Sequence, residues 1–394
     1  MTNPVRVDLT AIRPHASGGV EGVAAGVTRE IVAQREHSSV VVTSADRSAW
    51  AERLGTPPAR LAVVSGSGGS RMGRIASELS SHAATAPARA RISRAVAHYR
   101  ARAAASQVTE PVWYPFHRTP AMARTSVVTL HDLRVFQPGL EDAANQRTIT
   151  ANVDRASALV VSWMHPYWQT LELFPEVADR LFVVPLPVLN PGEFRHAALS
   201  PRGPLRVLVP VGTSAHKNQE LVIKALGSLN DVEVTFTGGT EEPRFGELRE
   251  LAGEIGVLDR VRWAGYVSTD ELEQFYDTCD VLVMPSRWEA ASGPVFEAVA
   301  RGIPFIATNI APIASQVEQF KLVGPLVDPD RPDELAAAVN EVRDNYAAFA
   351  DAQLEPSRTL RAITWSSCAA RYLEILDWAA AKQAGLNPTP PPHV

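Results

Sequence analysis

The chain has 394 residues, more than one hydrophobic core usually supports, so we expect two domains. Its apolar fraction of 45% and charged fraction of 21% are those of an ordinary globular protein and argue against extended disorder or a collagen-like repeat. The formal net charge of −5 at pH 7 gives no general attraction to nucleic acid, so no nucleic-acid partner is expected.

Strand-like and helix-like segments alternate through the first half of the chain. A helix is predicted from Val20 to Ile31, where apolar residues recur at helical spacing. Strands are predicted at 5–10, 40–43, 61–65, 126–130, 158–162 and 181–185. Strands separated by helices favour a parallel sheet that is covered on both faces. We therefore predict a Rossmann-like α/β domain over residues 1–188.

The segment 71–102 is strongly basic, with seven arginines and the single acidic residue Glu78. Two interpretations stay open: a solvated basic helix, or a surface that contacts an anionic membrane or a phosphorylated acceptor. The chain has no run of about eighteen apolar residues and no signal-peptide pattern. This favours a cytoplasmic protein, peripheral at the inner membrane face if segment 71–102 binds lipid. Its two cysteines, Cys279 and Cys368, are too few for a disulfide framework or a structural zinc site.

Residues 189–204, rich in proline, glycine and polar side chains, are interpreted as an interdomain linker. Beyond them, strands are predicted at 205–211, 232–238, 261–266, 281–286 and 305–308, with helices at 219–229, 246–256, 270–279 and 294–301. This pattern predicts a second doubly wound α/β domain over residues 205–355. The helix in 356–385 is expected to pack back on the first domain, and the proline-rich tail 386–394 to be disordered.

Two carboxylates, Glu289 and Glu297, lie eight positions apart on the loop and helix that follow strand 281–286. Ligands of open α/β sheets bind at the carboxyl ends of the strands, where helix N-termini point. Unpaired N–H groups near Ser292 to Val295 can donate to a phosphate or a sugar hydroxyl, and the carboxylates can accept from vicinal diols. The alternative is that Glu289 is an exposed loop residue and Glu297 a partner of the helix dipole.

A second loop, 209–220, follows the first strand of the second domain. Gly212 gives it backbone freedom, and Lys217 stands just before the next helix, where a cation can neutralise a diphosphate. Asn218 is predicted to cap that helix. The loop lacks the Gly-Lys-Ser/Thr of a phosphate-binding P-loop, so ATP-type phosphoryl transfer is disfavoured. A surface lysine in a capped loop is the alternative.

The first half offers weaker signals. Gly18 and Gly19 precede a helix, where paired glycines either let the backbone approach a ligand or make a tight turn. His131 follows strand 126–130, a position at which a histidine is more often structural than catalytic. The aromatic segments 113–118 and 163–168 can stack on sugars, but such residues more often fill a core.

In this order the motifs resemble the retaining glycosyltransferases of family 4, which have the GT-B architecture of two Rossmann-like domains facing each other across a cleft. The resemblance rests on Gly18–Gly19, TLHDL (129–133), HKN (216–218), AGYVSTDELEQFYDTCDVLVMPS (264–286), EAASGPVFEAVARGIPFIATN (289–309) and the closing TWSSCAARYLEIL. It implies transfer of a mannosyl-, rhamnosyl- or glucosyl-type hexose from a nucleoside-diphosphate sugar. The acceptor would be a sugar, a lipid-linked compound or a secondary metabolite. Residues 1–188 would form the acceptor side and 205–355 the donor side.

The resemblance also implies roles for single residues. Glu289 would accept hydrogen bonds from the donor sugar, Glu297 would hold the ribose, and His131 would line the pocket near the reacting carbon, so that His131 and Glu289 are the expected catalytic residues. The donor-binding set is Gly18, Gly19, Gly212, Lys217, Tyr266, Val267, Ser292, Gly293, Pro294, Val295 and Glu297. The acceptor set is Arg13, His15, His117 and Arg118. No metal and no cofactor are expected, because cationic side chains and helix N-termini neutralise the leaving diphosphate.

Two departures from the family pattern concern the donor pocket. Where the family commonly has Glu-Gly-Phe-Gly-Leu-Pro, this chain has EAASGP, with Ala290 and Ser292 in place of the glycines and Gly293 one position later. The lysine loop also lacks the arginine that precedes the family's lysine. Diphosphate binding then loses one cation, unless Arg287 or another residue supplies it. Two alternatives therefore stay open: a sugar-nucleotide epimerase of the same fold, and a catalytically silent binding protein.

Overall fold

The computed structural model describes residues 3–14, 19–63, 105, 107–117, 119, 121–195, 203–240 and 242–393. The chain divides into two compact units. Unit 1 comprises Met1–Ser162, Pro166–Leu186 and Trp365–Val394, and unit 2 comprises Trp163–His165 and Pro187–Thr364. The basic segment 71–102 lies outside the described residues.

Unit 1 is built on a parallel sheet. Within the described residues this sheet has seven strands in the order β3-β2-β1-β4-β5-β6-β7. The strands are β1 (Arg6–Asp8), β2 (Ser39–Val42), β3 (Leu61–Val63), β4 (Val112–Tyr114), β5 (Ser126–Thr129), β6 (Ala158–Val161) and β7 (Leu181–Val183). The strand order changes direction between β1 and β4, which is where doubly wound sheets bind their ligands.

Strand β4 is absent from the sequence prediction. It has three residues, all buried, and its aromatic composition gives no alternation of apolar and polar side chains. Trp113 in this strand is fully buried and donates from Nε1 to Thr129 Oγ1 at 3.0 Å. The core interpretation of segment 113–118 is therefore confirmed for Trp113.

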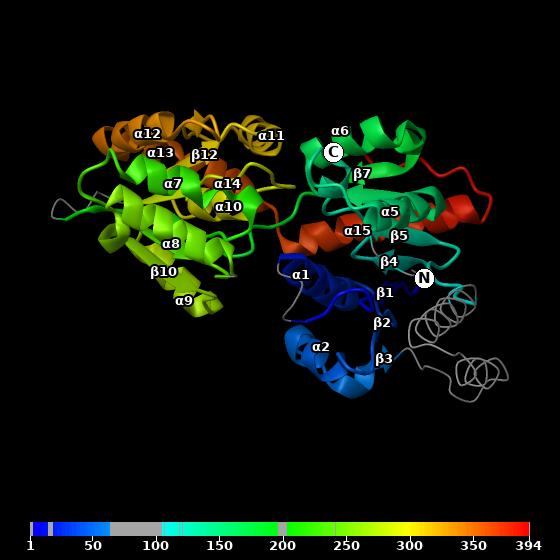
Figure 1. Ribbon diagram of the computed structural model, residues 1–394. Helices are drawn as coiled ribbons and strands as arrows, with labels where there is room; N and C mark the ends of the chain where they lie inside the picture. Colours follow the sequence, from blue (N-terminus) through cyan, green and yellow to red (C-terminus); the bar gives the residue numbers. More distant parts are fainter. Residues whose placement is uncertain are drawn as a thin grey trace, which may run out of the picture. The chain divides into compact units, whose positions relative to one another are not determined.

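The helices of unit 1 cover both faces of its sheet (Figure 1). They are α1 (Gly19–Gln34), α2 (Arg47–Leu54), α5 (Ala143–Arg155), α6 (Met164–Leu173, beginning in unit 2 residues) and α15 (Trp365–Gln383). Helix α15, the last in the chain, lies beside α1, the first, and against β5 (Figure 1). The contact between the two helices is close at Gly26, because a Cβ atom there would lie 2.6 Å from the Trp365 ring.

The C-terminal tail binds the edge of this sheet. Val183 of β7 donates its N–H to the His393 carbonyl at 2.9 Å, and His393 Nδ1 donates to the Leu181 carbonyl at 2.8 Å. The His393 ring also stacks on Phe182, with ring centroids 5.3 Å apart. The prediction of a disordered tail is therefore wrong up to residue 393, because the tail pairs with groups that an edge strand otherwise leaves open.

Unit 2 contains a second parallel sheet. In the described part of the chain it has six strands in the order β10-β9-β8-β11-β12-β13. They are β8 (Leu205–Val209), β9 (Val232–Thr237), β10 (Val261–Gly265), β11 (Val281–Met284), β12 (Phe305–Thr308) and β13 (Leu326–Val327). The order changes direction between β8 and β11. The loops that leave these two neighbouring strands are therefore the first place to look for a ligand site.

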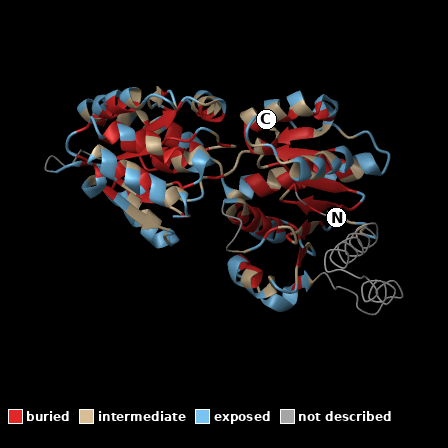
Figure 2. Ribbon diagram, in the orientation of Figure 1, coloured by how far each residue is buried: buried red, intermediate tan, exposed pale blue. Residues whose placement is uncertain are grey.

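The helices of unit 2 differ in how far they are buried (Figure 2). They are α7 (Gln219–Leu226), α8 (Arg244–Ile255), α9 (Thr269–Thr278), α10 (Gly293–Ala300), α11 (Ala311–Phe320), α12 (Pro332–Asp344), α13 (Tyr346–Ala352) and α14 (Leu354–Ala362). Helix α9 begins with a capping box between Ser268 and Glu271. Helix α10 is buried from Val295 to Ala300, packed against β11, β12 and α14, and is followed by Gly302 in the left-handed region (φ 73°).

The ends of the second domain differ from the prediction. Residues 189–195, assigned to a linker, are fastened to unit 2, where Arg195 donates its N–H to the Arg301 carbonyl at 2.9 Å. The chain returns to unit 1 between Thr364 and Trp365, so α14 belongs to unit 2 and α15 alone to unit 1. Of the aromatic segment 163–168, Trp163 is buried against Phe296, whereas Trp168 is 61% exposed.

No helix among the described residues combines the length and the apolar character that crossing a bilayer requires.

Replacing Gly26 by alanine is expected to destabilise the protein by about 1 to 3 kcal/mol, because the new Cβ meets the Trp365 ring. The matched change Gly253→Ala, near the end of α8, meets nothing within 4 Å and is expected to stabilise by about 0.5 to 1 kcal/mol. Denaturant unfolding of both variants measures the two effects. Shifts of the same sign would contradict the close packing of α15 on α1.

Candidate functional site

The loops after β8 and β11 meet through an ion pair. Lys217, at the end of a 3₁₀ turn (Ala215–Lys217), donates from Nζ to Glu289 Oε1 at 2.6 Å. The Glu289 side chain is 9% exposed and that of Lys217 24%, so the pair is partly shielded from water. The two charged residues that the sequence singled out on separate loops are thus in direct contact at the point where the strand order changes direction.

Asn218 holds these loops together. Its backbone is left-handed (φ 55°), and its Nδ2 donates to the carbonyls of Pro285 at 3.0 Å and Pro329 at 2.9 Å. Asn218 does stand at the N-cap position of α7, as predicted, but its side chain makes no capping hydrogen bond to that helix. The Arg287 N–H donates to the His216 carbonyl at 2.8 Å, which ties the same two loops a second time.

The Arg287 guanidinium, considered as a substitute for the missing cation, is paired with Asp330 at 2.6 Å. Both side chains of this pair are exposed, so the ion pair adds little to stability, and Arg287 can leave Asp330 at little cost.

Gly212 lies against Gly238 and Gly239, a glycine pair that the sequence motifs did not include. A Cβ on Gly212 would lie 3.3 Å from the Gly239 nitrogen, and one on Gly238 (φ 111°) would lie 2.8 Å from the Gly212 nitrogen. Thr213 donates its N–H to the Gly239 carbonyl at 3.1 Å. These glycines allow the loops after β8 and β9 to pack backbone to backbone. The signal for this contact was the Gly-Gly that ends the strand predicted at 232–238.

The N-terminus of α10 is formed by Ser292, Gly293, Pro294 and Val295. Gly293 borders open space, whereas Val295 is buried. The Ser292 N–H, one of the groups predicted to bind a ligand, donates to Gln316 Oε1 of α11 at 2.8 Å. Within the described residues, neither the buried Ser292 hydroxyl nor Gln316 Nε2 has a hydrogen-bond partner. Gln316 could not be found from the sequence, because it lies on another helix 24 positions away.

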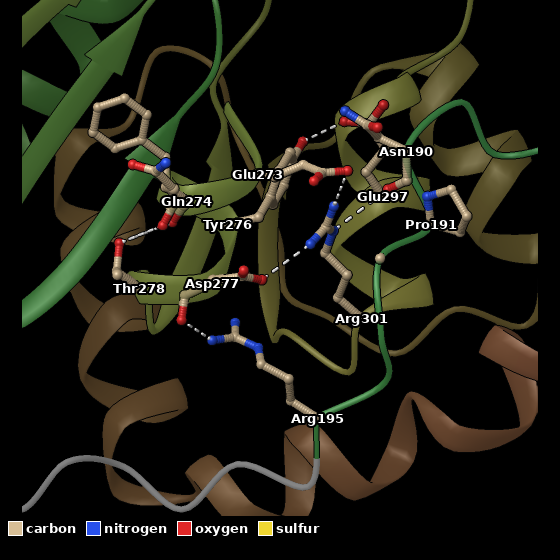
Figure 3. Close-up of polar contacts among 12 residues, drawn as sticks. Asn190, Pro191, Arg195, Glu273, Gln274, Tyr276, Asp277, Thr278, Glu297 and Arg301 are labelled. Carbon is tan, nitrogen blue, oxygen red and sulfur yellow. Dashed lines mark hydrogen bonds and ion pairs between the residues drawn. The ribbon is translucent and has the colours of Figure 1, made fainter. Parts of the chain in front are cut away.

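Glu297 is a charged residue on a buried helix. It is 8% exposed, and its Oε2 accepts a hydrogen bond from Tyr276 Oη at 2.6 Å (Figure 3). Burial raises the pKa of the carboxyl above its usual value, while the hydrogen bond from Tyr276 and the charge of Arg301 oppose that rise. Burial and the neighbouring Glu297 likewise hold the pKa of Tyr276 well above its ordinary value. Tyr276 therefore stays a hydrogen-bond donor.

The two residues predicted to contact the base follow β10, the strand at one edge of the unit 2 sheet. Tyr266 is 82% exposed and Val267 is half-buried. A tyrosine ring at the carboxyl end of a strand can stack on a planar ligand.

In unit 1, His131 follows β5 and is fixed by the loop after β4. Because the Pro115 carbonyl can only accept, His131 Nε2 carries the proton of their 2.8 Å hydrogen bond, and Nδ1 is left as an acceptor. Burial lowers the pKa of the imidazole to about 4, so the ring is neutral at pH 7. Asn152 of α5, which no sequence motif singled out, donates from Nδ2 to the carbonyls of His117 at 2.7 Å and Thr119 at 3.1 Å.

The remaining predicted residues of unit 1 divide into three groups. Gly19 is the first residue of α1 and has open space around it, and Arg13 is exposed. His117 is only 1% exposed, so its ring is part of the protein interior and the acceptor contact predicted for it is not supported. His15, Gly18 and Arg118 lie outside the described residues.

No cluster of three or more histidine, cysteine, aspartate or glutamate side chains suited to a metal ion occurs in the part of the chain that the structure describes. The site in unit 2 offers instead a cation, two carboxylates and a helix N-terminus. This set can bind an anion that is joined to a group bearing several hydroxyls.

Comparison with known proteins points to the same unit. Residues 193–353 match the family model described as Glycosyl transferases group 1. Over 272 residues the chain is 26% identical to D-inositol 3-phosphate glycosyltransferase of Paenarthrobacter aurescens, covering 66% of this chain and 65% of that protein. Over 153 residues it is 35% identical to GDP-mannose-dependent alpha-(1-6)-phosphatidylinositol monomannoside mannosyltransferase of Mycobacterium tuberculosis, covering 35% and 39%. The matches thus span less than two thirds of either relative.

Solved structures match over nearly the whole chain. Sucrose-phosphate synthase from Thermosynechococcus elongatus aligns with a TM-score of 0.68 at 18% identity, over 96% of this chain and 100% of that one. Anabaena HepE in complex with UDP aligns with a TM-score of 0.67 at 16% identity, over 96% and 100%. These likenesses establish the fold: the predicted GT-B architecture, with two Rossmann-like α/β domains, is confirmed.

Protonation of His131 is expected to lower stability in mild acid. Its folded-state pKa of about 4 lies below the ordinary value of 6.5, so the unfolded chain binds the proton more tightly and stability falls as pH drops from 6.5 towards 4. The loss between about pH 7.5 and about pH 5 is on the order of 2 kcal/mol. His131→Gln should reduce this acid loss in denaturant unfolding, whereas His37→Gln, at an exposed position, should leave it as in the parent. Equal acid losses in all three proteins would contradict a neutral His131 ring in the folded protein.

Proposed function

We propose that the protein is a retaining glycosyltransferase that moves a hexose from a nucleoside-diphosphate sugar to an acceptor hydroxyl. The observation that carries the proposal is the contact between Lys217 and Glu289 at the carboxyl ends of β8 and β11. In such a donor the diphosphate and the sugar are adjacent, so a cation beside a carboxylate is complementary to both groups at once. The match of residues 193–353 to the Glycosyl transferases group 1 model supports this assignment.

Lys217 and Glu289 satisfy each other in the absence of a ligand and separate when the donor binds. The ammonium of Lys217 turns to the diphosphate and stabilises the negative charge that develops as the bond from the sugar to the diphosphate breaks. Glu289 accepts hydrogen bonds from the sugar hydroxyls, and Glu297 accepts from the ribose. The N–H groups of Gly293 and Val295 at the start of α10 face the same anionic charge.

His131 is proposed to contact the donor sugar near the reacting carbon. Its Nε2–H is held by the Pro115 carbonyl, so Nδ1 can accept a hydrogen bond from a sugar hydroxyl. Glycosyl transfer places positive charge on the sugar ring in the transition state. A ring that burial keeps neutral does not repel that charge. The remaining donor contacts are proposed for Gly18, Gly19, Gly212, Pro294, Tyr266 and Val267.

The acceptor is proposed to be a sugar, a lipid-linked compound or a secondary metabolite, bound from unit 1 with Arg13, His15 and Arg118 at the site. The names of the two relatives make inositol-based acceptors the first to test. No metal or cofactor is included in the proposal, because Lys217 and the α10 N-terminus supply charge stabilisation. A cytoplasmic location, with membrane contact through segment 71–102, completes the proposal.

A catalytically silent nucleotide-binding protein is the rival that a specific observation favours. Gln316 already occupies the Ser292 N–H, which removes one donor from the ligand site. Incubation with a panel of nucleoside-diphosphate sugars and acceptors, with detection of the released nucleoside diphosphate, separates the two. Release that depends on an acceptor supports transfer, and nucleotide binding without release supports the silent protein. A rearranged sugar formed from the donor alone identifies an epimerase.

Lys217→Met is expected to weaken binding of a nucleoside diphosphate by about 10- to 100-fold, the loss of one charge-assisted hydrogen bond. Binding of the nucleoside without phosphates should not change. Lys224→Met, on the exposed face of the adjacent α7, is the matched control and should bind the diphosphate as the parent does. Titration calorimetry measures all three proteins. Equal losses for nucleoside and diphosphate would exclude a phosphate contact by Lys217.

Glu289→Gln is expected to have opposite effects on the two halves of the donor, the diphosphate and the sugar. The variant removes the charge that engages Lys217 in the free protein, so a nucleoside diphosphate should bind as tightly as in the parent or more tightly. The sugar half loses a charged acceptor, and transfer should fall by at least about 100-fold. Calorimetry with the diphosphate and a rate measurement with the full donor test this pair of outcomes. Unchanged transfer would remove Glu289 from the catalytic set.

A further inference from the structure

Arg301 is fully buried yet carries a charge. It lies one helical turn beyond Glu297, with its guanidinium 4.9 Å from the centre of the Tyr276 ring. Nη1 donates to Asp277 Oδ1 at 3.1 Å, Nη2 lies 3.9 Å from Glu273 Oε1, and Nε donates to the Asn190 carbonyl at 3.4 Å. Figure 3 shows the guanidinium among these groups, between α9 and the segment that carries Asn190.

The segment 190–195, by which the chain enters unit 2, is shaped around this guanidinium. Gly192 has φ 50°, and a Cβ there would lie 2.2 Å from Arg301 Cζ, so any other residue would displace the guanidinium. Arg361 of α14 donates from Nη2 to the carbonyls of Pro191 at 2.9 Å and Gly192 at 2.7 Å. Arg195 reaches back to the Asp277 carbonyl at 2.5 Å (Figure 3). The entry segment is thus fastened to α9 and to the buried helix that bears Glu297.

Tyr276 connects this arrangement to the site. Within the described residues it is the hydrogen-bond partner of the Glu297 carboxylate, and it engages Oε2 only. The carboxylate cannot rotate without losing that bond, and Oε1 is left to accept from a ligand. The Tyr276 ring is in turn held in place by the stacked guanidinium.

We infer that Tyr276 and Arg301 are positioning residues for donor binding: Tyr276 fixes the orientation of the Glu297 carboxylate, and Arg301 fixes Tyr276 against the entry segment 190–195. The inference rests on the proposed function, in which Glu297 accepts a hydrogen bond from the ribose. It adds two residues that contact no ligand, and it makes the geometry of the entry segment a determinant of nucleotide affinity.

The charges around Glu297 give the inference a pH signature. The groups that face it are Tyr276 of α9 and Arg301, which directly follows α10. Glu273 and Asp277 pair with Arg301, and Arg195 donates to the Asp277 carbonyl. Burial raises the pKa of Glu297, and the Tyr276 hydroxyl opposes that rise. Removing the hydroxyl therefore raises the pKa further. A ribose binds the ionised carboxylate, so affinity is present above this pKa and is lost as pH falls through it.

The first test compares the parent, Tyr276→Phe and Tyr372→Phe, titrated with UDP and with GDP from about pH 5 to about pH 8. Tyr372 is the matched control, because its hydroxyl is also fully buried and bonds Thr129 in unit 1. Tyr276→Phe should bind about 3- to 10-fold more weakly near neutral pH, with the midpoint of its pH profile shifted upward. Tyr372→Phe should follow the parent. Superimposable profiles of Tyr276→Phe and the parent would overturn the inference, whereas a parent that binds neither nucleotide would overturn the proposed function.

The second test concerns the entry segment. Gly192→Ala should weaken nucleotide binding and shift the pH profile as Tyr276→Phe does, because its methyl group displaces Arg301. Gly256→Ala is the matched control: Gly256 is also left-handed (φ 75°) and in unit 2, but a Cβ there meets nothing within 4 Å. It should lower stability and leave the affinity unchanged. Parent-like binding by Gly192→Ala would overturn the part of the inference that concerns Arg301.

Discussion

The need to neutralise charge inside unit 2 determines much of its structure. Helix α10 is buried from Val295 to Ala300, yet Glu297 lies within it and Arg301 directly follows it. An unpartnered buried charge costs about 3 to 5 kcal/mol, a large part of a domain's stability. The protein meets this constraint with Tyr276 on the carboxylate and with Asp277, Glu273 and the Asn190 carbonyl around the guanidinium. The position of α9 and the course of the entry segment both follow from these contacts.

The same helix contributes to the site. It follows the loop that leaves β11, the strand beside β8 at the point where the strand order changes direction. Asn218 and Arg287 fasten those loops to each other, so Lys217 and Glu289 are held in contact before a ligand arrives. A preformed pair of opposite charges suits a ligand that carries an anion next to hydroxyl groups. It also means that binding exchanges one ion pair for another, which limits the desolvation cost.

The sequence was sufficient for features that depend on local pattern. Alternating strands and helices gave both sheets, and the spacing around Glu289 and the position of Lys217 pointed to neighbouring loops of one sheet. It was insufficient wherever a distant segment decides the outcome. The short aromatic strand β4, the left-handed backbone of Asn218, the capture of Ser292 by Gln316 and the binding of His393 to β7 each depend on a partner far along the chain. Burial of His117 belongs to the same class, because no local pattern distinguishes an enclosed histidine from an exposed one.

We expect the donor to bind where Lys217 contacts Glu289. A crystal structure of the full chain with a nucleoside diphosphate bound would decide this. We expect the diphosphate within hydrogen-bond distance of Lys217 Nζ, at the N-terminus of α10, with a ribose hydroxyl on Glu297 Oε1 and the Lys217–Glu289 contact opened. A nucleotide bound elsewhere, with that ion pair still closed at 2.6 Å, would contradict it.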